Sequence, residues 1–506
     1  MASEYTLKQI SDFKNITDGS ADCDFDFHIT LPQYMDDLLK IVKSSAVPYI
    51  TGYEKTKNEV KFYGKTKIDI IYISSNDNCI KTYSCDEDFS KTVSINLDLP
   101  DNSAVKYKTI KKYDSTRMIN QRRIDIHSSF SIDYFVFSKY ECEIISDCDN
   151  LKKNILNTKK LNYCACTTEK IDFCEQIGNT EENVKIKSII NTFSNVNLKE
   201  INIVQDKALI KAQLRISVIY TIDDNDESIN KFSTLIDINK IIDVSGIDEK
   251  SLCICNLDVQ NICTTAKADE NGELKIFEAA GRICVNFDAF CEENESFIID
   301  AYCPGKNISC EFETINNGRL IAKIKDKTLF KSVVSFDSID ISEICDLTVN
   351  CIKTEMKCDS TVKIKAKLMI EIIYKSTDGN MMFAKTTEDL EYDTSINEKN
   401  ISGLSNIEFL SFDYIIKSQN KIEIRLDSSI DAILCKKNNI KALKSFSDTD
   451  DKTIETPALV IYFANEKDNV WNIAKKFSSD VDLIIKENDL TSDIIESKRI
   501  LMIPGI

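Results

Sequence analysis

The segment ALIKAQLRISVIY, from Ala208 to Tyr220, alternates apolar with polar residues and closes on three apolar ones. VKFYGKTKIDIIY (Val60–Tyr72) and VKIKAKLMIEIIY (Val362–Tyr374) share both the alternation and the ending. Alternation with a period of two is typical of a β-strand that buries one face. The three segments lie roughly 150 residues apart, which indicates an internal repeat.

A second strand pattern keeps the same period. It comprises RIDIHSSFSIDYFVF (Arg123–Phe137), ELKIFEAAGRICVNF (Glu273–Phe287) and KIEIRLDSSIDAIL (Lys421–Leu434). Polar tips that suit hairpin turns follow the first pattern in each copy: SSNDN (Ser74–Asn78), DDNDE (Asp223–Glu227) and STDGN (Ser376–Asn380). The sequence therefore predicts a mainly β protein with three tandem antiparallel domains, each a sandwich or an open barrel.

The last segment of the chain has a different pattern. ALVIYFA (Ala458–Ala464) and RILMIP (Arg499–Pro504) predict two strands. Between them, apolar residues with helical spacing predict a first helix on Val470, Ile473, Ala474 and Phe477 and a second on Val481, Ile484 and Ile485. We expect Asn469 to cap the first helix, and Ser479 with Asp482 to form a capping box on the second. The result is a small β-α-α-β unit.

These patterns predict six segments. They are an N-terminal segment 1–27, repeats at 28–140, 160–290 and 300–440, a polar acidic linker at 444–457, and the β-α-α-β unit at 458–506.

Composition excludes several classes of function. The 506 residues carry a formal net charge of -18, which disfavours binding to nucleic acid. The sequence contains no apolar run long enough for a transmembrane segment, and its N-terminus lacks the order of a signal peptide. We therefore expect a cytoplasmic protein.

The sequence offers little for catalysis or metal binding. The 19 cysteines are an odd number in a long chain, so we expect reduced thiols, and the Cys-x-Cys pairs Cys164/Cys166 and Cys253/Cys255 lack the usual zinc spacing. The two histidines, His28 and His127, have no partner motif, and no glycine-rich phosphate loop, zinc-protease motif or nucleophile elbow occurs. We expect no catalytic residue, no cofactor and no metal.

The paired strand patterns resemble the SPOCS domain, which is found in spore coat and sporulation proteins of anaerobic spore-forming bacteria. The similarity rests on the repeated Ile-Ile-Tyr or Val-Ile-Tyr strand and on the charged-apolar strand some 50 residues later. It implies three SPOCS repeats.

The C-terminal unit, with KDNVWNIAKKF, VDLIIKEND and ILMIP in order, resembles the LysM domain, a reader of peptidoglycan or chitin. This resemblance implies a ligand groove between the first turn and the segment after the second helix. The matching positions, with the neighbouring tryptophan, are Lys467, Asp468, Asn469, Trp471, Lys486, Asn488, Asp489 and Leu490.

The first turn departs from the family. Its usual Gly-Asp-Thr is Lys467, Asp468 and Asn469 here, so a long side chain stands where a glycan approaches backbone, in a turn that favours positive φ. This argues against sugar binding. Trp471, the single tryptophan, is either part of the core or a binding anchor on the rim.

Three SPOCS repeats followed by a LysM unit resemble the morphogenetic scaffolds of the clostridial spore coat. The resemblance implies a non-enzymatic protein in the mother cell, at the outer surface of the forespore, that binds the morphogenetic ATPase of the coat basement layer through its LysM unit. The alternative is a peptidoglycan-binding sporulation or cell-wall protein. An enzyme is a third and weaker possibility.

Overall fold

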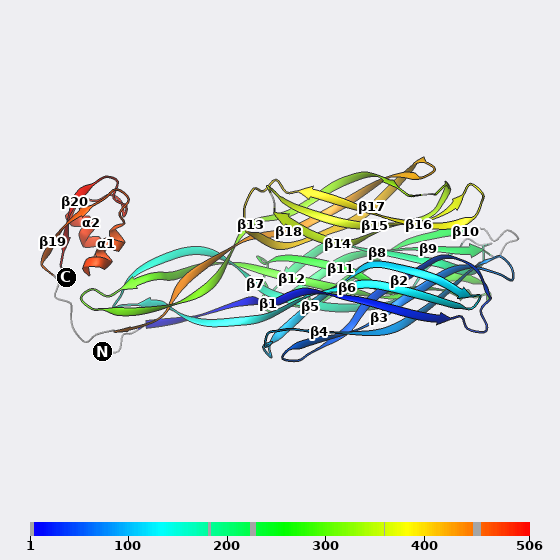
Figure 1. Cartoon of the computed structure of the whole chain (residues 1–506), viewed down its shortest axis with the longest axis horizontal. Coiled ribbons are helices and arrows are strands. Elements are labelled where there is room, and N and C mark those ends of the chain that lie inside the picture. Colours follow the sequence, from blue (N-terminus) through cyan, green and yellow to red (C-terminus); the bar gives the residue numbers. More distant parts are fainter. Residues whose placement is uncertain are drawn as a thin grey trace.

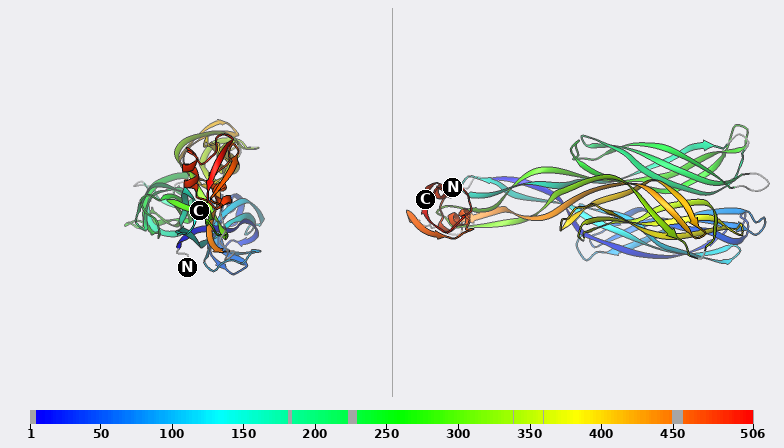
Figure 2. Two further views of the ribbon diagram at one scale, coloured as in Figure 1. Left: turned by 90° about the vertical axis from the view of Figure 1, so that its left-hand side faces the viewer. Right: turned by 90° about the horizontal axis from the view of Figure 1, so that it is seen from above.

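The computed structural model describes residues 5–180, 184–222, 229–337, 339–358, 360–448 and 457–505. The fold is mainly β, as the sequence predicts, and is built largely from three-stranded antiparallel sheets. Three six-stranded units follow one another along the chain and lie as three lobes around a common axis (Figure 2). The predicted tip Asp223–Glu227 and most of the predicted linker fall outside the described residues.

Each unit consists of six consecutive strands of the chain. The first contains β1 (Tyr5–Thr30), β2 (Leu38–Lys55), β3 (Glu59–Ser74), β4 (Ile80–Ser94), β5 (Ser103–Asn120) and β6 (Arg123–Cys148). The second contains β7 (Lys152–Asn179), β8 (Ile186–Val204), β9 (Lys207–Ile222), β10 (Ile229–Asp243), β11 (Leu252–Ala268) and β12 (Leu274–Tyr302). The third contains β13 (Ile308–Ser335), β14 (Ile341–Cys358), β15 (Val362–Ser376), β16 (Met381–Asp393), β17 (Ile401–Ser418) and β18 (Lys421–Asp448).

Within a unit the six strands form two sheets that share one core. The orders are β1-β6-β5 with β2-β3-β4, then β11-β12-β7 with β10-β9-β8, and then β13-β18-β17 with β14-β15-β16. In the third unit, buried side chains of β15 pack with those of β18 and β17 from the opposite sheet, among them Ile364, Ile370, Ile424 and Ile407. Burial of one face of each sheet explains the period-two pattern in the sequence.

The two strand patterns of the sequence form the central strand of each sheet. The first pattern lies on β3, β9 and β15, and the second begins β6, β12 and β18. A central strand has hydrogen-bonding neighbours on both sides and its inner face lies deepest in the core. This position explains why apolar and polar residues alternate more regularly along a central strand than along an edge strand.

The Ile-Ile-Tyr ending of the first pattern points in two directions. Tyr72 and Tyr374 pack into the core of their own units. The residue before each tyrosine points to the opposite face, and there Ile71, Ile219 and Ile373 meet in a single cluster, each 4% exposed. One motif therefore contributes both to the core within a unit and to the contact between the three lobes.

The first and last strands of each unit continue beyond the other four strands and form a trunk. The first strand of each unit pairs with the last strand of that unit along almost its whole length: β1 with β6, β7 with β12, and β13 with β18. The three strand pairs twist together away from the lobes (Figure 1). Their buried side chains form a shared core that includes Ile10, Ile144, Phe297, Ile315 and Ile440.

The strands of the trunk extend beyond the predicted repeats. The predicted N-terminal segment 1–27 is not separate from the first repeat, because residues from Tyr5 onward form β1 and pair with β6. Similarly, the stretches between the predicted repeats are strand residues of the trunk, and the predicted linker begins inside β18. The sequence pattern of β1 is weak because only Ile10, Cys23, Phe27 and Ile29 along it are fully buried.

The C-terminal unit has the predicted element order. Strand β19 (Leu459–Ala464), helix α1 (Val470–Phe477), helix α2 (Val481–Glu487) and strand β20 (Arg499–Pro504) follow one another, and β19 pairs antiparallel with β20. We call this β-α-α-β unit the terminal unit; it lies at the end of the trunk (Figure 1). Within the described ranges, α1 and α2 are the only helices, and neither has the length and apolar character needed to cross a membrane.

One capping prediction holds and one is wrong. Asn469 caps α1, its side chain accepting a hydrogen bond from the backbone N–H of Trp471 at 2.8 Å. The cap of α2 is Asp480 rather than Ser479, because the Asp480 carboxylate accepts from the N–H groups of Asp482 and Leu483. Ser479 is buried instead, and its hydroxyl donates to the carbonyl of Pro504.

Candidate functional site

The turn between β19 and α1 lies directly against the segment that precedes β20. Lys467 N–H donates to the carbonyl of Ile495, and Ile495 N–H donates to the carbonyl of Asp468, both at 2.8 Å. Lys467 has φ 71°, in the left-handed region where the family's glycine would be unstrained. The positive φ predicted for this turn is therefore present, with lysine holding it.

The eight predicted groove residues fall into two groups. Lys467, Lys486 and Asp489 are exposed. The others are at least half-buried and several build the unit: the Asp468 carboxylate accepts from the N–H of Asn465, and the buried Asn488 side chain ties α2 to β20 through the backbone of Met502. Asn469 is the cap of α1, and Leu490 packs against the core of the terminal unit.

Trp471 attaches the terminal unit to the trunk. Its indole Nε1–H donates to the Asp300 carboxylate at 2.8 Å, and its ring packs edge-to-face on Tyr302, with the ring centroids 5.1 Å apart. The Asp300 carboxylate also accepts from Lys475 Nζ at 2.6 Å. Asp300 and Tyr302 lie at the end of β12, so the tryptophan is an anchor between two parts of the same chain.

Tyr302 completes this attachment, which we call the trunk dock. The tyrosine is 5% exposed, belongs to the core of the terminal unit, and donates its hydroxyl hydrogen to the carbonyl of Ser479 at 2.7 Å. Burial raises the pKa of its phenol, and the nearby Asp480 adds to the shift. Lys152 at the start of β7 forms an ion pair with Asp480. The terminal unit is thus fixed to the trunk by apolar, hydrogen-bonded and ionic contacts together.

The outer face of the two-stranded sheet in the terminal unit is apolar. Cross-strand neighbours pair Phe463 with Ile500 and Ile461 with Met502. Together with Leu459 they are 44–73% exposed, although all five are large hydrophobic residues. The inward-facing residues Val460 and Tyr462 instead pack on the core of the unit. We call the five outward-facing side chains the apolar face; a contiguous exposed patch of this kind is typical of an interaction surface.

A second candidate site lies on the axis between the three lobes. It is a cavity of about 1180 Å³, lined by β1, β2, β5 and β6 of the first unit, by β7, β8, β11 and β12 of the second, and by β13, β14, β17 and β18 of the third. Its wall includes Ile10 and Ile315 of the trunk core, so the cavity adjoins the trunk. We call this cavity the axial chamber.

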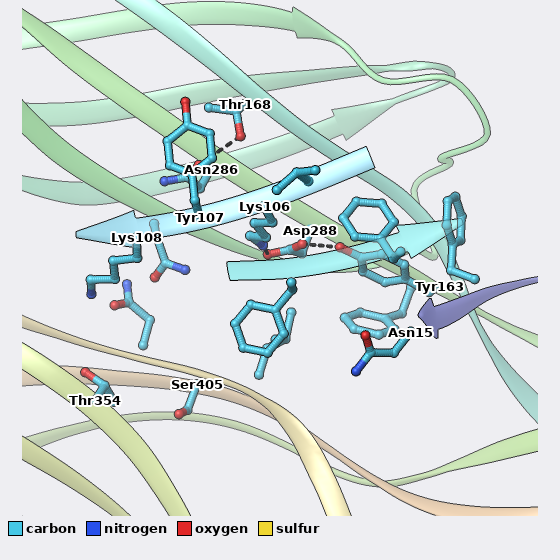
Figure 3. Close-up of a pocket in the computed structure, with 18 of the residues that line it drawn as sticks. Asn15, Lys106, Tyr107, Lys108, Tyr163, Thr168, Asn286, Asp288, Thr354 and Ser405 are labelled. Carbon is cyan, nitrogen blue, oxygen red and sulfur yellow. Dashed lines mark hydrogen bonds and ion pairs between the residues drawn. The ribbon is translucent and has the colours of Figure 1, made fainter. Parts of the chain in front are cut away.

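Aromatic and charged side chains share one part of the chamber wall (Figure 3). Tyr163 lies between Phe13 and Phe290, with ring centroids 5.2 and 5.0 Å from its own. Its hydroxyl donates to the fully buried Asp288, which also pairs with Lys106. Burial, together with the Asp288 charge, raises the pKa of Tyr163 far above its usual value.

Two other carboxylates that line the chamber, those of Glu408 and Asp258, have pKa values above the usual range. Burial raises the pKa of Glu408 on β17 to about 7, and its carboxylate accepts from the N–H of Leu198 at 3.0 Å and from the side-chain amide of Asn406 at 3.1 Å. Burial also raises the pKa of Asp258 on β11, against which the charge of Lys108 acts. Both acids line the chamber; Glu408 is half-buried, whereas the Asp258 side chain is exposed to the solvent that fills it.

The cysteines give one further difference from the sequence-based expectation. Cys164 of β7 and Cys291 of β12 form a disulfide, with Cα atoms 6.1 Å apart, so the prediction of reduced thiols is wrong for this pair. A register shift leaves Cys164, between Tyr163 and Ala165, as an extra residue of β7 near Phe290 and Cys291 of β12. Across the described residues, no group of three or more histidine, cysteine or acidic side chains is arranged to hold a metal ion.

The family comparison identifies part of the second unit. A family model described as the SPOCS domain of SipL matches residues 185–267, which run from β8 to β11. The match supports a SipL-like family. A SPOCS domain indicates a protein connected with sporulation and the spore coat. No curated protein and no solved structure matches the chain.

The SipL match covers the strands that carry ALIKAQLRISVIY, the pattern with which the sequence resemblance began. The likeness of the terminal unit to LysM stays a prediction. Sequence reasoning missed the trunk dock, the apolar face and the chamber. The alternation of Leu459, Ile461 and Phe463 with Val460 and Tyr462 carried a usable signal, since a strand apolar on both faces needs cover on both.

Proposed function

We propose that the chain is a non-enzymatic spore coat scaffold of the SipL type, which works on the mother-cell side of the forespore surface. Its terminal unit binds a protein partner, the morphogenetic ATPase of the coat basement layer, and the trunk and lobes hold that unit at a fixed distance from the next coat layer. The SPOCS match supports the connection with the coat.

The apolar face is the observation that carries this proposal. Ile461 and Phe463 are 63% and 73% exposed, whereas the same strand buries Ala464 to 3%. Exposed apolar side chains gain free energy when a partner removes them from water, at about 25 cal/mol per Å². A glycan, which presents hydroxyl groups, would leave aliphatic side chains poorly matched, so the composition of this face favours a protein.

The groove chemistry supports the same choice. Lys467 projects from the turn where a LysM domain would bring backbone close to a sugar, while Asn488 and Leu490 are committed to the fold of the unit. The trunk dock leaves the apolar face uncovered, since it engages Trp471, Lys475 and Asp480 on the helices.

The test is binding of the full chain to the purified coat ATPase and, in parallel, sedimentation with purified peptidoglycan. We expect Ile461→Arg to weaken binding to the ATPase by at least about 30-fold, the size of an interface hot spot. The matched control is Ile241→Arg on β10, where the isoleucine is similarly exposed at 60%. Equal ATPase binding by both variants would refute the role of the apolar face, and sedimentation with peptidoglycan alone would replace the scaffold by a wall-binding protein.

A further inference from the structure

Most carboxylates of the axial chamber have a cationic partner. Asp288 pairs with Lys106, and Asp12 lies 3.6 Å from the buried Lys160. Glu313 accepts from Lys444 at 2.9 Å and from a tyrosine hydroxyl at 2.8 Å. Pairing of this kind offsets the cost of removing charge from water.

Glu408 is the exception. Both hydrogen bonds that its carboxylate accepts come from neutral donors, the backbone N–H of Leu198 and the amide of Asn406. Asp431 and Lys325 act on it with opposite sign and at smaller strength than burial does. A carboxylate held in this way lacks a positive charge in contact with it.

Asp258 adds a second acidic group on a neighbouring strand. It lines the same chamber from β11, and β11 and β17 are in contact. Lys108 of β5 is the cation that acts on Asp258, whereas Lys325 acts on Glu408. Two carboxylates without an ion pair of 4 Å or less among the described residues thus line the chamber, one from the second lobe and one from the third.

The rest of this wall supplies neutral oxygen atoms. Asn350, Thr354 and Ser405 line the chamber, and Lys108, Thr354 and Ser405 lie around a common space in Figure 3. Amide and hydroxyl oxygens accept hydrogen bonds from an N–H donor. Further along the wall lie the aromatic rings of Phe13, Tyr163 and Phe290, which suit an aliphatic chain.

We propose that the axial chamber is a binding site for a small aliphatic diamine or polyamine, whose ammonium groups pair with Glu408 and Asp258 and whose methylene chain lies along the apolar part of the wall. The volume of about 1180 Å³ exceeds what such a chain needs, so water fills the remainder. A flexible chain with separated charges suits two carboxylates that belong to different lobes.

The proposal also predicts proton release. Because the Glu408 pKa is about 7, a large share of these carboxyl groups is protonated at neutral pH, and a bound ammonium group favours the ionised form. Binding at pH 7 must therefore release protons into the buffer. This readout distinguishes a contact with Glu408 from binding elsewhere on an acidic surface.

The test is isothermal titration calorimetry of the full chain with 1,5-diaminopentane at pH 7, in two buffers of different ionisation enthalpy. We expect saturable binding with proton release, while 1,5-pentanediol, which has the same chain without charge, does not bind. Glu408→Gln should weaken binding at least about 10-fold and abolish the proton release. Asp413→Asn, an exposed acid on the same strand, is the matched control and should bind like the unaltered chain.

Asp258→Asn provides a second variant with the same expected loss of affinity. Absence of saturable binding in the unaltered chain would overturn the proposal, and so would unchanged affinity in both chamber variants. Equal binding of the diamine and of Mg²⁺ would assign the effect to general acidity and would also overturn it.

Discussion

Replacement of Asp300 by alanine should release the terminal unit from the trunk. The Asp300 carboxylate accepts hydrogen bonds from Trp471 Nε1 at 2.8 Å and from Lys475 Nζ at 2.6 Å. A hydrogen bond from a neutral donor to a charged acceptor contributes about 1.5–3 kcal/mol. The ion pair is partly exposed, with 44% and 28% of the two side chains accessible, and adds about 0.2–1 kcal/mol.

The loss should therefore amount to about 2–4 kcal/mol of docking free energy, or a factor of roughly 30 to 900 in the docking equilibrium. Tyr302 and the Lys152–Asp480 ion pair remain in this variant. Combination with Tyr302→Ala removes a buried aromatic side chain as well, at a further cost of about 3–5 kcal/mol. The single and double variants should therefore lose increasing amounts of docking free energy.

Trp471 is a convenient probe because it is the only tryptophan of the chain. We expect acrylamide to quench its fluorescence more strongly, and its emission to shift to the red, in the order unaltered chain, Asp300→Ala, double variant. Glu496→Ala, an exposed acid of the same unit, is the control. If the double variant keeps the quenching and emission of the unaltered chain, the trunk dock does not hold the terminal unit and the reasoning fails.

Three further predictions concern stability. Lys467→Gly should raise the unfolding free energy of the terminal unit by about 0.5–1 kcal/mol in thermal denaturation, since φ is 71° and glycine removes that strain at some cost in chain entropy. The carboxyl group of Glu408 stays protonated up to about pH 7 in the folded state but ionises near pH 4.5 in the unfolded state. The free energy of unfolding therefore decreases as the pH rises from about 4.5 to about 7. Urea unfolding should show that Glu408→Gln removes up to about 3 kcal/mol of this pH-dependent loss, and an unchanged pH profile would contradict the raised pKa. Ile219→Ala should cost about 2–5 kcal/mol in the same assay, against less than about 0.5 kcal/mol for the exposed Ile241→Ala.

Local patterns in the sequence predicted the local parts of the structure. Alternation located the central strands, because their inner faces are buried along most of their length, as in β15. The cap at Asn469 and the positive φ at Lys467 followed from contacts within a few residues. The cap of α2 was misplaced by one residue, since both Ser479 and Asp480 are good capping residues and only tertiary burial of Ser479 decides between them.

Contacts between distant residues could not be predicted in this way. Trp471 and Asp300 are separated by 171 positions, and neither has a sequence neighbour that announces the other. The wall of the axial chamber comes from three units, so the pairing of Asp288 and the isolation of Glu408 depend on how the lobes are arranged. Strand β1 was missed as part of the first repeat because its partner β6 ends more than a hundred residues later.

The shared clusters explain why the three repeats act as one body. Ile71, Ile219 and Ile373 meet near the ends of β3, β9 and β15, while Ile144, Phe297 and Ile440 meet in the trunk. Each unit therefore buries apolar side chains against its neighbours in two separate clusters. Removal of one repeat would expose both clusters and open the chamber, so the repeats differ from independent domains on a string. The terminal unit likewise shares buried side chains with the rest of the chain, because its core includes Tyr302 of the second unit. The contacts of the trunk dock hold the terminal unit, with its apolar face, at the end of the trunk, as the proposed scaffold function requires.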